Sequence, residues 1–497
     1  MKTEAMAHQT EALGRMDGMR NFALLLEQGC GKTWTTLADA ERCFNLNKID
    51  ALIIFAPNGV HANWVRREIP THLGIPYVAY VWRGTPKTKK DKAAFAKLYD
   101  DPPGTGVIKI LAINIEAVNT DNGYDAAQEF IHSFRTMAVV DESTRIKNPA
   151  SKRTEKIIKL GRDATARRIL TGTPITKAPT DLYSQFDFLK SGLLGTRSYR
   201  SFVAEYAVLE KPGSDKMMAI VKKMGPKAQF AQVVAIDEYG NKKWRNLDKL
   251  RRMIEPHCFR ATKEECLDLP PKVYKRVYFE MGSKQRAVYE ELRDEYHYVH
   301  MDVEDVSFQA IAARTKMKQV TSGFINVRGE SFDVNAEPEG ILEPKENPRM
   351  AVFKDLIETQ YEPFIVWAIY EQEIIQVLAA LKEAGISSVS YYGKTSTEDR
   401  EKAIDQFQSG QVQAFVGHAQ AAGIGLTLTA ASTAIYYSCS YDNELRRQSE
   451  DRCHRIGTKK TVLYIDLVAE DSIDEEVLAS LASKNKVADY VIDGRKT

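Results

Sequence analysis

Apolar and polar positions alternate in the same way in two separate regions of the chain. In each region, short apolar segments rich in β-branched residues are followed by longer segments with apolar residues at helical spacing. This alternation predicts βαβ units and therefore parallel sheets. The predicted strands of the first region are Asn21–Leu26, Ala51–Ala56, Val107–Ile113, Met137–Asp141 and Arg168–Thr171. Those of the second are Phe364–Ala368, Ser388–Tyr391, Val412–Val416, Thr433–Tyr437 and Val462–Val468.

The predicted fold class is α/β, with two doubly wound parallel-sheet lobes. A chain of 497 residues exceeds what a single core usually serves. We expect the first lobe at 1–270, with a helical insertion at about 191–258. Charged helical segments follow, and such a long break is uncommon inside one compact domain, so we place a helical linker at 271–348 and the second lobe at 349–497.

Composition and charge narrow the class of protein. With 43% hydrophobic and 27% charged residues, the chain has the composition of a soluble globular protein. Its longest apolar runs, Ala51–Ala56 and Phe364–Tyr370, are far shorter than the roughly 20 residues that cross a bilayer. The first residues lack the apolar stretch of a signal peptide, so we expect no membrane partner and a cytoplasmic location. A net charge of +2 confines any nucleic-acid surface to a local patch.

A nucleotide-binding motif follows the first predicted strand. Gly29 and Gly31 precede Lys32 and Thr33, and a helical segment begins there. Glycines let the backbone wrap closely round phosphates, whose charge is balanced by N–H groups, the helix N-terminus and the lysine. The threonine hydroxyl is suited to Mg²⁺. The motif therefore predicts ATP and Mg²⁺ as ligands.

Two adjacent carboxylates, Asp141 and Glu142, end a later strand of the same region. Ligands of an open parallel sheet bind at the carboxyl ends of its strands. We expect Asp141 to hold Mg²⁺ and Glu142 to orient and deprotonate the attacking water, because phosphoryl transfer mainly needs positioning and charge neutralisation.

Further motifs occur in a fixed order along nearly the whole chain. They are His8-Gln9, Ala56-Pro57-Asn58 with Asn63-Trp64, Arg145 to Pro149, Leu170 to Ile175, Phe259 to Lys263, Tyr392 to Ser396, Ala421 to Leu428 and Gln448 to Gly457. With the nucleotide motif and the carboxylate pair, this series resembles the Swi/Snf-type branch of the superfamily-two helicases, in its compact bacterial or phage form. The resemblance implies two RecA-like lobes.

The resemblance also assigns nucleotide contacts outside the first motif. It implies that Gln9 reads adenine and that Gly425 and Gln448 approach the nucleotide. It further implies that Arg452 and Arg455, from the second lobe, stabilise charge in the transition state, so that hydrolysis requires closure of the lobes. Gln448, Arg452 and Arg455 are spaced at helical intervals and are expected on one face.

By the same resemblance, Pro57, Lys147, Thr171, Gly393 and Thr427 are expected to contact the nucleic acid. Contacts of this kind position a protein on phosphates without reading bases, so we expect little sequence preference.

The predicted function is that of a DNA-stimulated ATP hydrolase that translocates on double-stranded DNA and remodels DNA or protein–DNA complexes. We expect it to act as a monomer, also on forked or branched DNA. A strand-separating DNA or RNA helicase is the first alternative, and an ATP-gated scaffold without turnover is the second. Strand separation typically needs an aromatic or apolar wedge. Tyr199, Phe202 and Tyr206 are spaced as a helical stripe, and we expect them to pack against the first lobe instead.

Overall fold

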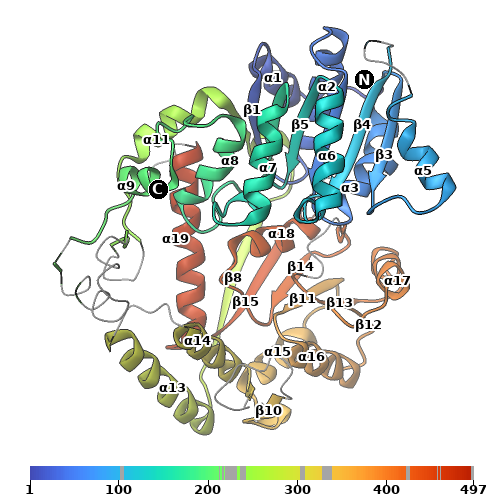
Figure 1. The fold of residues 1–497 in the computed structure, drawn as a ribbon. Helices are drawn as coiled ribbons and strands as arrows, with labels where there is room; N and C mark the ends of the chain where they lie inside the picture. Colours follow the sequence, from blue (N-terminus) through green and yellow to red (C-terminus); the bar gives the residue numbers. More distant parts are fainter. Residues whose placement is uncertain are drawn as a thin grey trace. The chain divides into compact units, whose positions relative to one another are not determined.

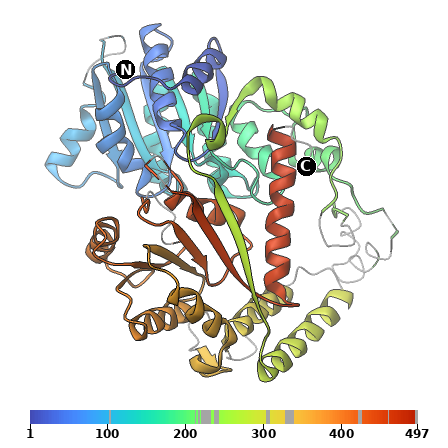
Figure 2. The ribbon, with the colours of Figure 1, turned by 180° about the vertical axis from the view of Figure 1, so that it is seen from behind.

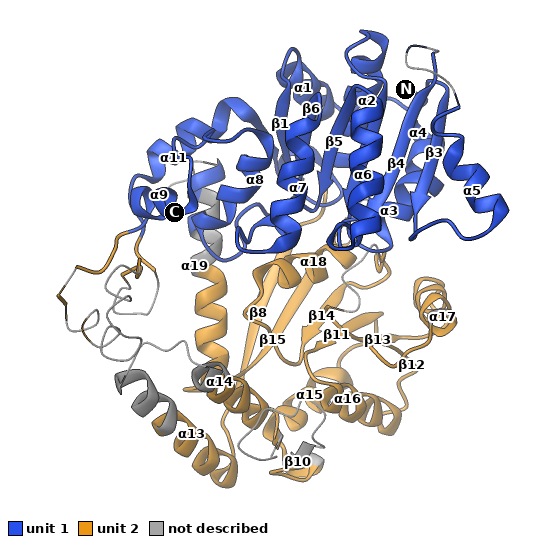
Figure 3. Ribbon diagram, viewed as in Figure 1, with its two compact units in different colours: residues 1–207, 244–268, 484–497 blue, residues 208–243, 269–483 orange. Residues whose placement is uncertain are grey.

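The computed structural model divides into two compact units, coloured separately in Figure 3. The residues that it describes are 1–100, 104, 106–211, 213–214, 218, 232–235, 242–302, 308–326, 338–420, 426–455, 457–458 and 460–493. Unit 1 comprises Met1–Ala207, Trp244–Asp268 and Lys484–Thr497, and unit 2 comprises Val208–Lys243 and Leu269–Ser483.

Unit 1 is built on a seven-stranded sheet in the order β3-β4-β2-β5-β6-β1-β7, and each neighbouring pair is parallel (Figure 1). Its strands are β1 (Asn21–Leu26), β2 (Ala51–Ala56), β3 (Tyr77–Trp82), β4 (Ile108–Asn114), β5 (Thr136–Asp141), β6 (Ala166–Leu170) and β7 (Cys258–Ala261). Its helices are α1 (Ala7–Met16), α2 (Lys32–Asn45), α3 (Val60–Asn63), α4 (Ile69–His72), α5 (Lys89–Ala96), α6 (Asp121–Ser133), α7 (Lys152–Asp163), α8 (Leu182–Leu189), α9 (Tyr199–Tyr206), α11 (Leu247–Ile254) and α12 (Lys263–Cys266).

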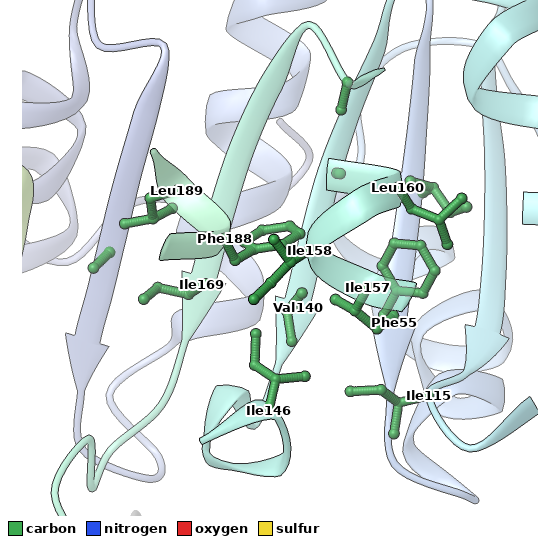
Figure 4. Packing of buried hydrophobic residues seen from close by; sticks show 14 of the residues in the cluster. Phe55, Ile115, Val140, Ile146, Ile157, Ile158, Leu160, Ile169, Phe188 and Leu189 are labelled. Atoms are coloured by element: carbon green, nitrogen blue, oxygen red, sulfur yellow. The ribbon is translucent and has the colours of Figure 1, made fainter. Parts of the chain in front are cut away.

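Helices cover both faces of this sheet. On one face, Ile157 of α7 and Phe188 of α8 pack with Val140 and Ile169 of the strands, as Figure 4 shows. On the other face, a separate apolar cluster joins α1 and α2 to the alternate residues of the same strands. Because neighbouring residues of a strand point to opposite faces, a strand covered on both sides is apolar throughout, as β2 is.

Unit 2 is built on a six-stranded parallel sheet in the order β12-β13-β11-β14-β15-β8. Figure 2 shows the yellow-green edge strand β8 beside the red strand β15. Its strands are β8 (Lys272–Phe279), β11 (Phe364–Ala368), β12 (Ser388–Tyr391), β13 (Ala414–His418), β14 (Thr433–Tyr436) and β15 (Val462–Ala469), with an antiparallel pair of β9 (Phe324–Asn326) and β10 (Pro338–Gly340) outside this sheet. Its helices are α13 (Ser283–Asp302), α14 (Phe308–Thr321), α15 (Pro348–Glu358), α16 (Glu371–Glu383), α17 (Thr397–Gln408), α18 (Asn443–Cys453) and the first part of α19 (Ile473–Asp493).

The prediction of two doubly wound parallel sheets is confirmed, and the two sheets share one winding. If the strands of each sheet are numbered in chain order, both sheets read 3-4-2-5-6-1, with β7 added beside β1 in unit 1. Three strands of these two sheets were not predicted, namely β3, β7 and β8, nor was the antiparallel pair of β9 and β10. β7 has four residues, while β8 is an edge strand with mostly exposed side chains and therefore lacks an apolar run.

Of the two segments that were predicted to be helical, the linker contains strands as well as helices. The linker placed at 271–348 opens with β8, which pairs with β15 along its whole length, and α13 and α14 follow. The insertion placed at 191–258 contains α9 and α11. Phe202 and Tyr206 of α9 are fully buried in the core of unit 1, which confirms the expected packing for these two residues. Tyr199 is 37% exposed, and its ring contacts Tyr183. Among the helices of the described ranges, none has an apolar stretch long enough to span a bilayer.

Candidate active site

The loop between β1 and α2 is built around two glycines in left-handed backbone conformations. Gly29 has φ +92° and Gly31 has φ +79°, which other residues rarely adopt. Gly31 is the N-cap of α2, and a Cβ atom there would lie 2.0 Å from the side-chain nitrogen of Gln9. The loop therefore needs glycine. It leads into the amino terminus of a 14-residue helix, where N–H groups and the helix dipole stabilise an anion.

Lys32 and Thr33 are the first two residues of α2, and both are half-buried. The ammonium group of Lys32 donates a hydrogen bond to the backbone oxygen of Leu26 at 3.0 Å. This contact holds the lysine side chain across the loop at the carboxyl end of β1. The structure thus brings together the four residues of the predicted nucleotide motif.

Helix α1 is attached to this loop by two neighbouring side chains. His8 Nε2 donates a hydrogen bond to the backbone oxygen of Cys30 at 2.9 Å. Gln9 is buried beside Gly31, and its side-chain oxygen accepts a hydrogen bond from Met6 N at 2.8 Å. Gln9 therefore lies at the nucleotide loop, and its contact with adenine stays a prediction.

Asp141 ends β5 at the same edge of the sheet as the nucleotide loop. It is 7% exposed, and Asp141 Oδ2 accepts a hydrogen bond from Trp64 Nε1 at 2.9 Å. Asp141 Oδ1 accepts one from Glu142 N at 3.0 Å. Burial raises the pKa of Asp141, while the Trp64 hydrogen bond and the charge of Lys32 act in the opposite direction. The carboxylate is thus fixed in orientation and lies within the electrostatic reach of Lys32.

The sequence pattern gave Trp64 a different role. It was grouped with Pro57, which is expected to contact the nucleic acid, but the Trp64 side chain is 1% exposed and its indole N–H donates to Asp141. Trp64 therefore orients the carboxylate that is predicted to hold Mg²⁺. Only a contact between residues 77 positions apart reveals this role.

Glu142 has a left-handed backbone conformation with φ +49°. For a residue with a side chain this costs on the order of 1–3 kcal/mol, and such conformations concentrate at functional sites. A short 3₁₀ turn, Ser143–Ile146, follows directly. The reversal turns the chain at the end of β5 and places Glu142 next to the buried Asp141.

Buried hydrogen bonds connect this turn to the loop after β6. Ser143 Oγ donates to Gln185 Oε1 at 2.7 Å. Gln185 is fully buried, and its amide nitrogen donates to the backbone oxygens of Pro174 at 2.8 Å and Asp181 at 2.7 Å. Gln185 was not predicted as a site residue, because a glutamine inside an apolar helix has no recognisable motif. It links the carboxylate turn to the next loop of the sheet.

The residues of unit 1 that were assigned to DNA differ in their surroundings. Lys147 Nζ lies 2.5 Å from Thr176 Oγ1. Thr171 is fully buried, and its hydroxyl accepts a hydrogen bond from Thr173 N at 3.1 Å. Its burial follows from its place directly after β6, where the hydroxyl completes the turn. Pro57 is buried in the loop after β2. Contact of these residues with DNA stays a prediction.

Arg260 of β7 contacts the start of the nucleotide loop through hydrogen bonds and an ion pair. Its guanidinium donates to the backbone oxygens of Leu25 at 2.9 Å and Gly172 at 3.1 Å, and forms an ion pair with Glu27 at 3.3 Å. Glu27 also accepts a hydrogen bond from Lys263 N at 3.0 Å. These contacts were not predicted as part of the site. They tie the first residue of the loop to the last strand of the sheet.

In unit 2, Arg452 and Arg455 lie beside the segment that begins at Leu426. Arg452 is 1% exposed and donates to the Leu426 backbone oxygen at 3.4 Å. Arg455 is half-buried and donates to the same oxygen at 3.3 Å and to Thr427 Oγ1 at 2.9 Å. Helix α18 ends at Cys453, so Arg455 lies beyond it. The prediction that Gln448, Arg452 and Arg455 share one helical face is therefore wrong for Arg455, which lies two residues beyond the end of the helix.

The other assigned residues of unit 2 lie on separate elements. Gln448 is half-buried on α18 and donates to Glu444 Oε1 at 3.1 Å. Gly393 is exposed, and its backbone oxygen accepts a hydrogen bond from Arg400 at 3.3 Å. Gly425, assigned to the nucleotide, falls outside the described residues.

Comparison with known proteins settles the family. Residues 12–337 match the model of the SNF2-related domain, and residues 348–457 match that of the helicase conserved C-terminal domain. The chain belongs to the SNF2-related family. It is thus a member of a family of helicase-like ATPases, and the resemblance inferred from its motifs is confirmed.

Curated relatives are similar at low identity. An uncharacterized ATP-dependent helicase of Mycoplasma pneumoniae is 26% identical over 385 residues, which cover 76% of this chain and 32% of the relative. The mouse chromodomain-helicase-DNA-binding protein 1-like is 24% identical over 94% of this chain and 47% of its own. The chain thus spans between about a third and a half of the length of these relatives. A solved SWI2/SNF2 ATPase core from Sulfolobus solfataricus, in complex with double-stranded DNA, aligns with 99% of this chain and 94% of its own, at 20% identity and a TM-score of 0.39.

Proposed function

We propose that this protein hydrolyses ATP in order to move along double-stranded DNA without separating its strands. Family membership supports the ATPase part. The observation that carries it is the arrangement at the carboxyl edge of the first sheet, where a glycine loop with its lysine and a buried, hydrogen-bonded aspartate follow β1 and β5. This edge is where open parallel sheets bind their ligands.

The residues of this edge suit a nucleoside triphosphate. The amino end of α2 and Lys32 would contact the phosphates. Thr33 and Asp141 offer the hard oxygen ligands that Mg²⁺ prefers, and the two hydrogen bonds on Asp141 keep its carboxylate in place. When bound, Mg²⁺ supplies charge neutralisation on the phosphate oxygens. Glu142 would orient the attacking water and accept its proton.

We further propose that unit 2 completes the reaction through Arg455. A guanidinium near the transferred phosphoryl group stabilises charge that develops in the transition state. Arg455 is half-buried and bonded to Thr427 and to a backbone oxygen, so its side chain is held by unit 2 before the nucleotide is bound. Arg452 is buried in the same place and would act by supporting this segment.

We propose double-stranded DNA as the track, and forked or branched DNA as further substrates. The protein would act as a monomer. The name of the mouse relative includes DNA binding, and the resemblance of the motifs points to a translocase. Phosphate contacts would dominate, so binding should weaken as salt rises. Burial of Phe202 and Tyr206 in the core of unit 1 removes two of the three aromatic residues that were considered as a wedge, while Tyr199 is 37% exposed. The loss of these two candidates supports translocation over strand separation.

The test is ATP hydrolysis measured with single-stranded DNA, duplex, forked duplex and RNA, beside a triplex-displacement assay and a forked-duplex unwinding assay. We expect stimulation by duplex and displacement of the third strand while the forked strands stay paired. Lys32→Ala is the control for ATP dependence. Release of a forked strand, with duplex failing to stimulate hydrolysis, would establish the helicase alternative. DNA binding without phosphate release would establish the scaffold alternative.

A further inference from the structure

A cavity of about 500 Å³ lies at the amino-terminal edge of the sheet of unit 1. This volume is in the range of sites that bind small molecules, about 300–1,000 Å³. Its wall is formed by the end of α1 with the turn into β1, by the end of α2, and by the segment between α7 and β6. The cavity lies wholly within unit 1.

The floor of the cavity is apolar. Met16, Cys43 and Ile49 line it, and each is less than 10% exposed. Met16 is the last residue of α1 and Cys43 lies in the last turn of α2, so the floor is the place where the two helices meet the sheet. Burial raises the pKa of the Cys43 thiol, which therefore stays neutral and acts as an apolar wall.

The rim of the cavity is positively charged. Its four cationic residues are Arg20, Arg42, Lys48 and Arg168, and Asp163 is the one acidic residue of the lining. Arg168 is 1% exposed and pairs with Asp39, and Arg42 pairs with Asp39 and Asp17, so Lys48 and Arg20 are the cations that the rim offers to a ligand. Lys48 is exposed, and no ion pair is recorded for it among the described residues. Arg20 Nε donates a hydrogen bond to the backbone oxygen of Thr165 at 2.7 Å, an uncharged partner. Positive charge at this rim therefore exceeds negative charge.

We propose that this cavity is a binding site for a small amphipathic anion. An apolar or aromatic body would cover Met16, Cys43 and Ile49, while a carboxylate, sulfonate or phosphate group would lie at Lys48 and Arg20. Arginine and lysine donate charge-assisted hydrogen bonds to such groups. Burial of the apolar body supplies the remaining affinity.

The site is separate from the nucleotide loop. Helices α1 and α2 and strand β1 each have one end at the cavity and the other end at that loop. In α1, Gln9 lies at the loop and Met16 at the cavity; in α2, Lys32 lies at the loop and Cys43 at the cavity. A ligand in the cavity would thus contact the far ends of the elements that form the loop. Binding there does not rest on the proposed ATPase function, so it should survive Lys32→Ala.

The experiment is a fluorescence titration of the full chain with 8-anilinonaphthalene-1-sulfonate, an aromatic anion. We expect saturable binding at one site per chain, which weakens as salt rises. N-phenyl-1-naphthylamine has the same aromatic body without the sulfonate, and we expect it to bind more weakly. Equal affinity for the two probes would contradict the role of the charged rim.

Two substitutions locate the probe. Lys48→Glu changes an exposed side chain, and we expect it to weaken binding by roughly five- to tenfold, as loss of one ionic contact does. Cys43→Met fills the floor, and we expect a similar loss. Lys97→Glu changes an exposed lysine of the same unit that does not line the cavity, and it should bind like the unmodified chain. Unchanged binding by Lys48→Glu, or an equal loss in Lys97→Glu, would overturn the proposal.

Discussion

The first strands of the two sheets occupy the same place in the same winding, and they end differently. β1 lies between β6 and β7, is almost wholly buried, and leads into the loop with two left-handed glycines. Its counterpart β8 lies at the edge of its sheet, where Tyr274 is 55% exposed. The turn after β8, residues 280–282, contains Gly282, which does not have a positive φ. A shared winding therefore does not by itself produce a phosphate site.

The carboxyl edge of the second sheet is also filled by the chain's own side chains. Arg286, at the start of α13, donates to the backbone oxygens of Glu470 at 2.9 Å and Asp471 at 3.1 Å. Glu373 is fully buried, and its carboxylate accepts hydrogen bonds from Ile369 N and Tyr370 N, both at 3.0 Å. N–H groups that precede a helix in this sheet are thus satisfied by a carboxylate of the protein. In the first sheet, we propose that the loop before α2 binds an external anion instead.

The largest expected effect is that of Arg455, the side chain of unit 2 that we propose takes part in ATP hydrolysis. Arg455→Ala should lower kcat by about 10³- to 10⁵-fold, as loss of an arginine finger does. ATP affinity should change less, because the guanidinium acts mainly in the transition state. Steady-state kinetics with duplex DNA measure both. Lys402→Ala, an exposed lysine of α17, is the matched control, and an unchanged kcat for Arg455→Ala would remove Arg455 from the site.

Glu142→Gln and Lys32→Ala compare two roles at the carboxyl edge of the sheet of unit 1, namely water activation and phosphate binding. For Glu142→Gln, we expect kcat to fall by about 10²- to 10⁴-fold, the usual contribution of a general base. ATP should still bind, since the phosphate contacts are intact. Lys32→Ala removes one of those contacts and should lose both turnover and ATP binding. Near-normal hydrolysis by both variants would show that the nucleotide site lies elsewhere.

Arg349→Met tests whether the ion pair of Arg349 with Asp474 stabilises the carboxyl edge of the sheet of unit 2. Arg349 is fully buried, pairs with Asp474, and donates to the Tyr437 backbone oxygen at 2.7 Å. Removing it leaves a buried carboxylate without its cation, which costs about 3–5 kcal/mol. Urea denaturation followed by hydrogen exchange in peptides of unit 2 measures the loss.

The control for this loss is a more exposed ion pair between α14 and α19. Arg314 pairs with Glu476 at 3.0 Å and is 41% exposed, so Arg314→Met should cost about 1 kcal/mol or less. Similar losses in the two variants would mean that the Arg349 pair is not the main support of this edge.

The smallest expected effect concerns Trp64. Trp64→Phe keeps the aromatic packing and removes the N–H group that donates to Asp141. A hydrogen bond to a charged group contributes about 1.5–3 kcal/mol, so kcat/KM should fall about tenfold or more. That hydrogen bond lowers the pKa of Asp141, so its loss should raise this pKa further. Asp141 must be ionised to bind Mg²⁺, and the acid limb of the pH–rate profile should therefore move to higher pH; an unmoved limb would contradict this role.

Much of the fold is readable from the sequence because buried parallel strands leave continuous apolar runs. β1, β2, β11 and β12 begin and end at the predicted residues. β8 was not predicted because most of its side chains face solvent at the edge of the sheet, where apolar residues are not required. The limits of such strands depend on pairing partners, which periodicity does not reveal.

The chemistry of the site was predictable where it depends on a local motif. The glycine loop and the Asp141–Glu142 pair are of this kind. The partners that orient these residues come from distant parts of the chain: Trp64, Gln185 and Arg260. Their roles depend on which side chains the sheet brings together, and no local spacing records that.

The most direct test of the central claim is the number of ATP molecules that one chain binds. Equilibrium dialysis of radiolabelled ATP with the full-length Glu142→Gln chain, which should bind without turnover, measures it. We propose a nucleotide site at the carboxyl edge of the sheet of unit 1, whereas the protein's own side chains fill the corresponding edge in unit 2. This account predicts one ATP per chain, and none after Lys32→Ala is added. Two ATP molecules per chain, or one that persists after Lys32→Ala, would contradict the account.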